Sequence, residues 1–525
     1  MNEKIRNDSY LSKRGYVITK EVLEKDELNE LKKVLVARPL VDKKFIGNNC
    51  GNGIQTDFPV YIQTKNKIII PKMYGIKKYG MPTSFLPNYI GEEWDHPIEF
   101  NGSLYESQIE PVNTLIKSCK ENGGGILSLK TGGGKTISLL YVLSKLKGKT
   151  IVVVNKVSLL AQWKSEISQF LPDARVGVIQ GQKKIDVEDK DIVIAMLQSL
   201  ARIDYPDSLF KDYQITVLDE IHNTSSRIFS KILFKLCSKY TIGLSATPTR
   251  SDGCEYVFKW HIGDIVYKSK SERKGMHPII RELKITSNEY KEVSAINKFT
   301  GQKTIQFTSM LSELVSMEKR NKLIIEIIKN CRSEGRKILV LSDRRNHLQL
   351  LYNILEKDLH INFTYGLFLG SMKITELEKS KACDVILATY AAFGEGVSEK
   401  DLDTLLLTTP KKFIGHLKNT SKNESGKLEQ ILGRIFRKEH DERNPLIIDF
   451  ADDFSVYKTQ SAGRRNFYKN HFKHAIFENC SINLDEHEDV SVNYIQKKKV
   501  KEQLEKNEAV EKLQMSMLSE CCIMD

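Results

Sequence analysis

Runs of apolar residues of strand length alternate with segments of helical periodicity over most of this chain. Between residues 103 and 265 the runs are GILSL, TIVVVN, RVGVIQ, DIVIAM, QITVLDE and TIGLSA, and each is almost continuously hydrophobic. Strands of a parallel sheet that helices cover on both faces have this character. The alternation resumes between residues 285 and 455 with KILVLS, TYGLFL, DVILAT, TLLLTTP and NPLIIDF. The pattern therefore predicts an α/β fold with two tandem parallel-sheet domains, 101–270 and 285–455.

The segments that flank these two regions have a different character. Residues 22–36 carry apolar positions at helical spacing, and the short β-like runs PVYIQ and KIIIPK follow among Gly, Asn and Pro. Residues 1–100 are therefore expected to form a small α+β accessory module. The basic stretch SERKGMHPIIRELK (271–284) predicts a linker, and the polar composition after residue 456 predicts a charged C-terminal tail, 456–525.

Composition narrows the classes of function. The chain has 525 residues with 80 Lys+Arg against 67 Asp+Glu, and the net charge of +13 suits a polyanionic partner, either nucleic acid or an acidic membrane surface. A lysine-rich solvated surface is the alternative. No apolar run approaches the ~20 residues of a membrane span. Nine scattered cysteines without a C-x-x-C pair indicate an intracellular, reducing compartment. The tryptophans Trp94, Trp163 and Trp260 are expected to be packing residues.

The first candidate for chemistry is the segment LKTGGGKT (129–136), between a strand candidate and a helix candidate. Glycines let the backbone N–H groups wrap a phosphate, and the helix N-terminus favours an anion. Lys135 would reach the β- and γ-phosphates, and Thr136 would ligate Mg²⁺. A short glycine turn is the alternative. The predicted phosphate-binding residues are Thr131, Gly132, Gly133, Gly134, Lys135 and Thr136.

Two further segments would complete such a site. The strand ITVLDE ends in Asp219 and Glu220, where a carboxylate can hold the cation and a second one can orient or deprotonate water. In QILGRIFR, Gln430, Arg434 and Arg437 fall at i, i+4 and i+7 and share one face if the segment is helical. Arginines so placed could stabilise charge on a transferring phosphate. The alternatives are two surface acids and a basic surface helix.

In this order, LKTGGGKT, LDEIH, LSATPTR and QILGRIFR resemble motifs I, II, III and VI of the superfamily 2 helicases. SLYESQ, NKVSLLAQW, AMLQSL, LVLSDRR and ATYAAFGEGVS are similar to the family's adenine-reading segment and to motifs Ia, Ib, IV and V. GLSATPTRSDG followed by VFKWHIGDIVY resembles the group of XPB, the phage recombination helicases and the poxvirus transcript-release helicase, in the form that large DNA viruses encode. One departure stands at residues 250–252, which read Arg-Ser-Asp where XPB-like proteins carry Arg-Glu-Asp.

The resemblance implies two RecA-like domains with ATP and Mg²⁺ in the cleft between them. It implies catalytic roles for Lys135, Asp219, Glu220, Gln430, Arg434 and Arg437, with Thr136 and Asp219 as the Mg²⁺ ligands. To the nucleotide-binding residues it adds Gln108 and Gly396. It implies coupling roles for His222, Ser245 and Thr247, and nucleic-acid contacts through Lys156, Gln162, Gln198 and Thr389.

The predicted function is that of an ATP hydrolase that translocates on nucleic acid, with DNA favoured over RNA. Its action would be strand separation or release of a stalled transcription complex, as a monomeric motor with viral transcription machinery as a partner and no membrane. The expected location is the cytoplasm or nucleus, and packaging in a virion is left open. Three alternatives stand beside it: an RNA helicase, a duplex-DNA translocase without unwinding, and an ATP-gated transcription scaffold that turns over little.

Overall fold

The computed structural model describes residues 2–39, 57–129, 133–221, 230–246, 248, 252–269, 277–296, 303–370, 372–393, 401–411, 431–432, 435, 443–472 and 474–486. The described chain divides into two compact units, the first ending before residue 270 and the second beginning at residue 277. Among the described residues, no helix combines the length and the apolar character needed to cross a bilayer.

The first unit is built on an eight-stranded sheet of order β11-β10-β12-β9-β13-β14-β8-β15. Every neighbouring pair is parallel except β10 with β11. The central strands are buried at almost every position, as their hydrophobic runs predict. The strands are β8 (Gly124–Ser128), β9 (Thr150–Val154), β10 (Val176–Gln180), β11 (Lys184–Asp186), β12 (Ile192–Met196), β13 (Ile215–Asp219), β14 (Tyr240–Ser245) and β15 (Ile265–Lys268).

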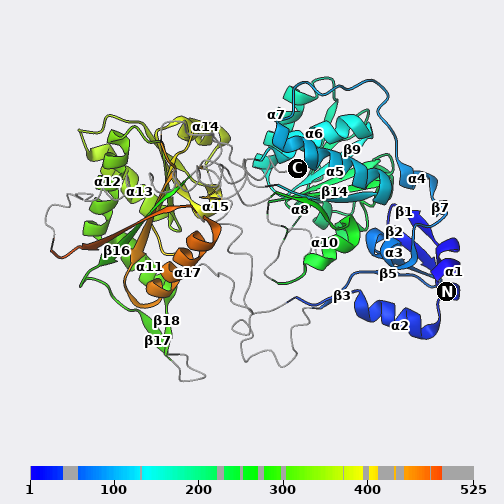
Figure 1. Ribbon diagram of the computed structural model, residues 1–525, viewed down its shortest axis with the longest axis horizontal. Coiled ribbons are helices and arrows are strands. Elements are labelled where there is room, and N and C mark those ends of the chain that lie inside the picture. Colours follow the sequence, from blue (N-terminus) through cyan, green and yellow to red (C-terminus); the bar gives the residue numbers. More distant parts are fainter. Residues whose placement is uncertain are drawn as a thin grey trace, which may run out of the picture. The chain divides into compact units, whose positions relative to one another are not determined.

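Helices cover both faces of this sheet (Figure 1). One face packs against α5 (Glu106–Asn122), α6 (Lys135–Leu146) and α7 (Val157–Phe170), whose apolar side chains share a core with the strands. The other face packs against α8 (Leu197–Arg202), α9 (Ser230–Leu233) and α10 (Glu255–Ile262). A short 3-10 helix, η3 (Asp207–Phe210), precedes β13. The result is a three-layer α/β domain with two separate apolar cores.

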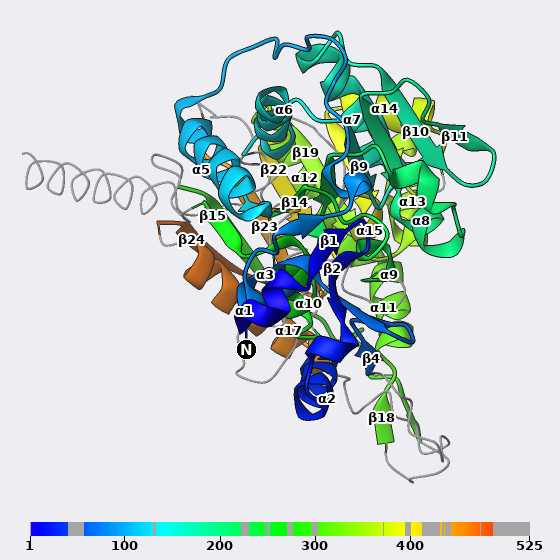
Figure 2. The same cartoon turned by 90° about the vertical axis from the view of Figure 1, so that its right-hand side faces the viewer.

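The N-terminal module has a five-stranded sheet of order β5-β6-β2-β1-β7. In both views α1 and α3 lie beside β1 and β2 (Figures 1 and 2). The helix that the sequence predicts within residues 22–36 is α2, which is shorter at both ends. The elements are α1 (Asn2–Asn7), β1 (Tyr10–Ser12), β2 (Gly15–Thr19), η1 (Lys20–Val22), α2 (Lys25–Val34), β3 (Val36–Ala37), β4 (Phe58–Pro59), β5 (Ile62–Gln63), β6 (Lys67–Ile70), α3 (Lys72–Tyr79), β7 (Ser84–Phe85) and α4 (Pro87–Ile90).

A buried lysine fastens this module to the amino end of the eight-stranded sheet. Lys72 begins α3, is 1% exposed, and its ammonium lies 2.9 Å from the carbonyl oxygens of both Gly123 and Ser238. The hydroxyl of Thr241 lies 3.1 Å from the same nitrogen. Burial lowers the pKa of Lys72 below its ordinary value, but the surrounding oxygens compensate part of that cost. The module is thus anchored at the starts of β8 and β14.

The second unit carries a seven-stranded, entirely parallel sheet of order β20-β21-β19-β22-β23-β16-β24. One face packs against α11, α12 and α13, and the other against α14 and α15. The helix α17 contributes Tyr457 to the first core and Tyr468 to the second. β17 and β18 form a separate two-stranded antiparallel sheet. The elements are β16 (Ile279–Thr286), β17 (Ser294–Ile296), β18 (Lys303–Ile305), α11 (Phe307–Ser316), α12 (Glu318–Ser333), β19 (Ile338–Ser342), α13 (Arg345–Lys357), β20 (Tyr365–Phe368), α14 (Ile374–Ala382), β21 (Val385–Thr389), α15 (Tyr390–Phe393), β22 (Thr404–Leu407), β23 (Leu446–Asp452), α17 (Ser455–His471) and β24 (Ile476–Asn483).

Two boundaries predicted from composition are wrong. β16 begins inside the predicted linker, and α17 and β24 lie inside the predicted tail, where β24 pairs with β16 over eight residues. Ion pairs explain the error, since they join charges on neighbouring elements. Arg281 on β16 lies 2.6 Å from Glu478 on β24, and Arg464 on α17 is buried 2.8 Å from Asp449. Charged residues that pair in this way make a packed strand look like a solvated segment.

The anchoring role of Lys72 predicts a loss of stability on substitution. Lys72→Met should lower the free energy of unfolding of the first unit by about 2 kcal/mol, because the buried carbonyl groups lose a charged donor. The matched control is Lys77→Met on the same helix, since the Lys77 side chain is 81% exposed. Denaturant unfolding followed by tryptophan fluorescence measures the effect, because Trp94, Trp163 and Trp260 all lie in this unit. Equal stability of the two variants would contradict the anchor.

Candidate active site

The predicted phosphate-binding loop leads from the end of β8 into the start of α6. Gly134 has a left-handed backbone, with φ +70°, directly before the helix begins at Lys135. The left-handed backbone favours glycine at this position, and a Cβ there would also require the end of the Gln108 side chain, whose Nε2 would lie at 2.1 Å, to move aside. Lys135 and Thr136 stand in the first turn of α6, where the partial positive charge of the helix terminus favours an anion.

Gln108 joins this loop to the beginning of α5. Its side chain is 3% exposed, and its Oε1 accepts a hydrogen bond of 2.9 Å from the backbone N–H of Tyr105. Its Nε2 approaches the carbonyl oxygen of Gly134 at 3.5 Å. The Tyr105 ring, by contrast, is 75% exposed beside this contact. Gln108 therefore braces the loop, and the neighbouring aromatic ring is left accessible.

The two acids at the end of β13 face the same loop. Nζ of Lys135 lies 3.3 Å from Oε1 of Glu220, and both side chains are largely buried. Oδ1 of Asp219 accepts a 3.0 Å hydrogen bond from the backbone N–H of Glu220, which has an unusual positive φ of 50°. A non-glycine residue in this region costs conformational energy and marks a position that the surroundings enforce. This turn follows the strand directly, and the Glu220 carboxylate faces Lys135 at the start of α6.

Burial and repulsion make Asp219 an unusual carboxyl group. Burial raises the pKa of Asp219 to about 6, and the adjacent Glu220 carboxylate adds to the rise. Lys135 and the indole of Trp163 oppose it: Nε1 of Trp163 donates a hydrogen bond of 3.0 Å to Oδ2 of Asp219. A cation brought to this carboxylate would further favour the ionised form.

The candidate nucleic-acid residues of the first unit lie along the same edge of the sheet. Lys156 follows β9 as the N-cap of α7, and Gln162 stands in that helix. Gln198 lies on α8 directly after β12, and its Nε2 donates to the backbone oxygen of Asn155 at 2.7 Å. Because β8, β14, β13, β9 and β12 are adjacent and parallel, their carboxyl ends form one continuous edge. That edge runs from the phosphate loop, past Asp219, to Lys156 and Gln198.

The comparison with known proteins identifies the family. A protein of Acanthamoeba polyphaga mimivirus, named as a putative ATP-dependent RNA helicase, is 32% identical over 466 residues, which are 87% of this chain and 85% of that protein. This chain belongs to the superfamily 2 helicases of the large-DNA-virus type. An African swine fever virus protein of the same kind of name is 28% identical over 395 residues, 71% of this chain and 74% of its own.

Two further likenesses accompany this assignment. Residues 101–250 match the family described as the res subunit of type III restriction enzymes. The solved structure of T4 UvsW covers 91% of this chain and 99% of its own length, at 16% identity and a TM-score of 0.34. The helicase is an ATP-hydrolysing enzyme of a family that binds nucleic acid. Its two large sheets, parallel except for the β10–β11 pair, confirm the predicted α/β class with tandem RecA-like domains.

Two other predicted residues of the helicase lie at the ends of strands in the described part of the chain. Ser245, at the end of β14, is fully buried opposite Ser128 of β8. Thr389 ends β21 in the second unit, where its hydroxyl accepts a 3.2 Å hydrogen bond from the backbone N–H of Ala392. The remaining predicted residues lie outside the described part of the chain, namely Thr131, Gly132, His222, Thr247, Gly396, Gln430, Arg434 and Arg437.

Trp163 is the residue of this site that the sequence did not single out. It was expected to pack in a core, which it does at 1% exposure, but its indole N–H also holds Asp219. Its place on the helix that follows β9 could have predicted this contact, because β9 is the direct neighbour of β13. A long side chain on the sheet-facing side of that helix can reach the end of the next strand.

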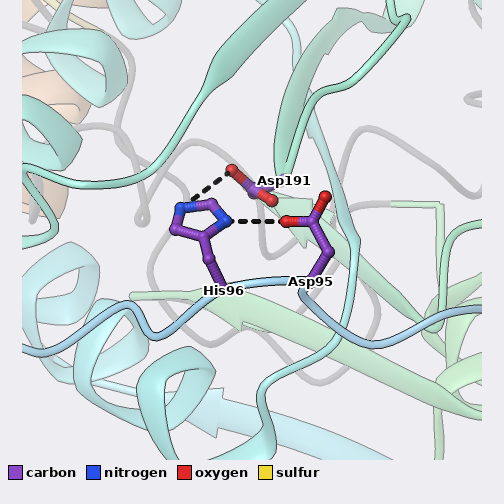
Figure 3. A group of neighbouring side chains, drawn as sticks. All are labelled: Asp95, His96 and Asp191. Atoms are coloured by element: carbon purple, nitrogen blue, oxygen red, sulfur yellow. Dashed lines mark hydrogen bonds and ion pairs between the residues drawn. The ribbon is translucent and has the colours of Figure 1, made fainter.

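A second cluster of polar groups lies away from the helicase's nucleotide loop. Asp95, His96 and Asp191 have the composition of a metal site (Figure 3). Nδ1 of His96 is 2.7 Å from Oδ1 of Asp95. The buried Asp191, however, is already engaged by the guanidinium of Arg175, at 2.8 and 2.9 Å. Because a bidentate arginine already pairs with this carboxylate, we interpret the cluster as an ion-pair network that ties residues 95–96 to Asp191, directly before β12.

Proposed function

We propose that this helicase couples hydrolysis of ATP to translocation on DNA, leading to strand separation or to release of a stalled transcription complex. The observation that carries the proposal is the cluster of Lys135, Asp219 and Glu220 at one sheet edge, beside the segment that begins at Lys156. The resemblance to XPB, the phage recombination helicases and the poxvirus transcript-release helicase favours DNA. It also favours viral transcription machinery as a partner.

The phosphate loop would bind the phosphates of the nucleotide, and α5 would contact its adenine base. Backbone N–H groups of residues 131–134 would cradle the phosphates, and Lys135 would contact the β- and γ-phosphates. Gln108 would read adenine once its amide exchanged its contacts with Tyr105 and Gly134 for the base. Glu220 would orient and deprotonate the attacking water. Gly396, Gln430, Arg434 and Arg437 are the further candidates, and the arginines would stabilise charge on the transferring phosphate.

The residues present suit Mg²⁺. Thr136 and Asp219 offer a hydroxyl and a carboxylate oxygen, which are the hard donors that this cation prefers. Oδ1 and Oδ2 of Asp219 each accept one hydrogen bond, so each oxygen retains a further lone pair for water or metal. Bound Mg²⁺ would supply charge neutralisation at the β- and γ-phosphates.

The contact between Lys135 and Glu220 allows Lys135 to exchange one anionic partner, the carboxylate, for another, the triphosphate. In the structure the ammonium pairs with the carboxylate at 3.3 Å. When a triphosphate enters, its greater negative charge draws Lys135 away, and Glu220 is released to accept a hydrogen bond from water. The exchange would thus link entry of the nucleotide to the freedom of Oε1 of Glu220.

Coupling to nucleic acid would run along the same edge. His222, Ser245 and Thr247 would connect the γ-phosphate to the nucleic-acid side, and Lys156, Gln162, Gln198 and Thr389 would contact the strand, largely through its phosphates. Such contacts position the strand without reading its sequence. We assign residues 1–100 to an accessory module, 101–270 to the ATP-binding domain and 279–486 to the second RecA-like domain.

RNA is the second candidate substrate, and a specific observation favours it. The mimivirus and African swine fever virus relatives are both named as RNA helicases. These names describe those proteins. Because the matches extend over most of this chain, RNA is the main alternative to DNA as the substrate.

Removing the lysine of the phosphate loop tests the nucleotide site. Lys135→Ala should lower the rate of ATP hydrolysis by about 10²–10³-fold or more, because charge that develops on the phosphates loses its fixed donor. Nucleic-acid binding, measured by fluorescence anisotropy, should stay within about threefold of the unaltered chain. Lys145→Ala is the control, since Lys145 is exposed on the same helix and lies over the Tyr141 ring. Turnover that survives in purified Lys135→Ala protein would remove this site from the proposal.

A panel of nucleic acids tests the substrate. ATP hydrolysis should be stimulated more by DNA, single-stranded or duplex, than by RNA of matched sequence. Affinity should fall steeply between 50 and 200 mM salt, by about 10³-fold if six phosphates are contacted, and should depend little on sequence. Stronger stimulation by RNA would replace the DNA proposal with the RNA one, and binding that ignores salt would contradict a path of phosphate contacts.

A further inference from the structure

Trp163 connects two parts of the first unit that the proposed function keeps separate. Its side chain comes from α7, seven residues after Lys156, and therefore about two helical turns along the same helix. Its indole nitrogen donates to Oδ2 of Asp219 at 3.0 Å. An indole N–H is a donor only, so this contact has one direction and requires an acceptor oxygen. The helix that carries candidate nucleic-acid contacts thus bonds directly to the candidate metal ligand.

The bond determines how Asp219 presents its oxygens. Oδ1 is held by the backbone N–H of Glu220 at 3.0 Å, and Oδ2 is held by Trp163. With both oxygens fixed, the carboxylate plane cannot rotate, and the lone pairs that remain point in set directions. Loss of the indole donor would leave Oδ2 without this partner in a largely buried place, where a donor to the charged form matters most.

The position of α7 itself is set by the nucleic-acid side of the sheet edge. The helix begins at Val157, directly after the segment Asn155–Lys156 that follows β9. The carbonyl oxygen of Asn155 is held by the Gln198 amide from α8, at 2.7 Å. A strand that contacts Lys156 or Gln198 would therefore bear on the first turn of α7. Because a helix moves as a rod, a small shift there reaches Trp163, which is packed against the sheet at 1% exposure.

We propose that Trp163 is a positioning residue that transmits nucleic-acid occupancy of the α7 segment to the metal-binding geometry of Asp219. This inference rests on the proposed function, since it needs both a nucleotide site at Asp219 and nucleic acid near α7. It adds a physical link by which nucleic acid could stimulate hydrolysis from within the first unit. The competing explanation is that Trp163 only fills the core.

The test removes the donor and keeps the bulk. Trp163→Phe deletes the indole N–H, and a second variant with 3-benzothienylalanine at residue 163 replaces that N–H by sulfur in a ring system of nearly the same shape. Trp260→Phe is the control, because Trp260 contacts Tyr74 and Tyr256 and lies outside the proposed site. Circular dichroism and the thermal midpoint establish that each variant is folded.

The first measurement does not depend on turnover. Binding of a fluorescent ADP analogue is titrated with Mg²⁺, and the half-saturating Mg²⁺ concentration should rise about tenfold in both position-163 variants and stay unchanged in Trp260→Phe. In the double variant Trp94→Phe/Trp260→Phe, Trp163 is the single tryptophan of the chain. Its emission should change when Mg²⁺ and ADP are added, and also when nucleic acid is added alone.

The second measurement is the ratio of hydrolysis rates with and without nucleic acid. This ratio should fall about tenfold in the position-163 variants, whereas a packing defect would lower both rates together and leave the ratio intact. If the Mg²⁺ dependence and the ratio are unchanged in a folded benzothienyl variant, Trp163 is a core residue and the inference is overturned. Failure of the proposed function is seen separately, as turnover that persists in Lys135→Ala.

Discussion

The parallel pairing of β8, β14, β13, β9 and β12 is the constraint on which the rest of the first unit depends. Parallel strands have both faces covered, so their interiors accept apolar side chains almost exclusively, and polar chemistry is confined to their ends. Register brings those ends level: Ser245 lies opposite Ser128, and Asp219 opposite Leu244. Strand pairing alone therefore brings together the loops that follow neighbouring strands. The phosphate loop and the two acids are neighbours for this reason.

The same strands are held at their opposite ends by the N-terminal module. Lys72 contacts the backbone that precedes β8 and β14, and Lys13 donates to the carbonyl oxygen of Tyr213, shortly before β13. Burial lowers the pKa of Lys13 to about 8, so the charged form of this second lysine is also disfavoured by its surroundings. One module thus clamps the amino ends of β8, β13 and β14. The carboxyl ends of these strands lead to the candidate phosphate loop, to Asp219 and to Ser245. The clamp therefore fixes the amino ends of these strands, which lie opposite the edge that carries the candidate site.

The sequence predicted those features that local pattern or short motifs determine. Nearly continuous apolar runs located the strands, and the glycines before Lys135 located the loop at the start of α6. Tertiary pairing decided what the sequence missed. β24 and α17 look polar because Glu478 and Arg464 need partners on other elements, Arg281 and Asp449, that no local window contains. Lys72 shows the opposite error. Its residue type predicts a place on the surface, and only the carbonyl groups that converge on it in the folded chain explain its burial.

Trp163 shows why residue type alone does not separate a packing residue from a residue of the candidate site. A buried tryptophan on a sheet-facing helix satisfies every expectation for a core residue, but burial also obliges its N–H to find an acceptor. At the end of a neighbouring parallel strand the nearest acceptor is the residue that terminates that strand, which here is Asp219. The core therefore supplies the donor that orients the carboxylate, and the positive φ of Glu220 supplies the turn that frees the other acid for Lys135. Packing thus specifies the geometry of the charged groups, and the charged groups in turn restrict which side chain the core can hold.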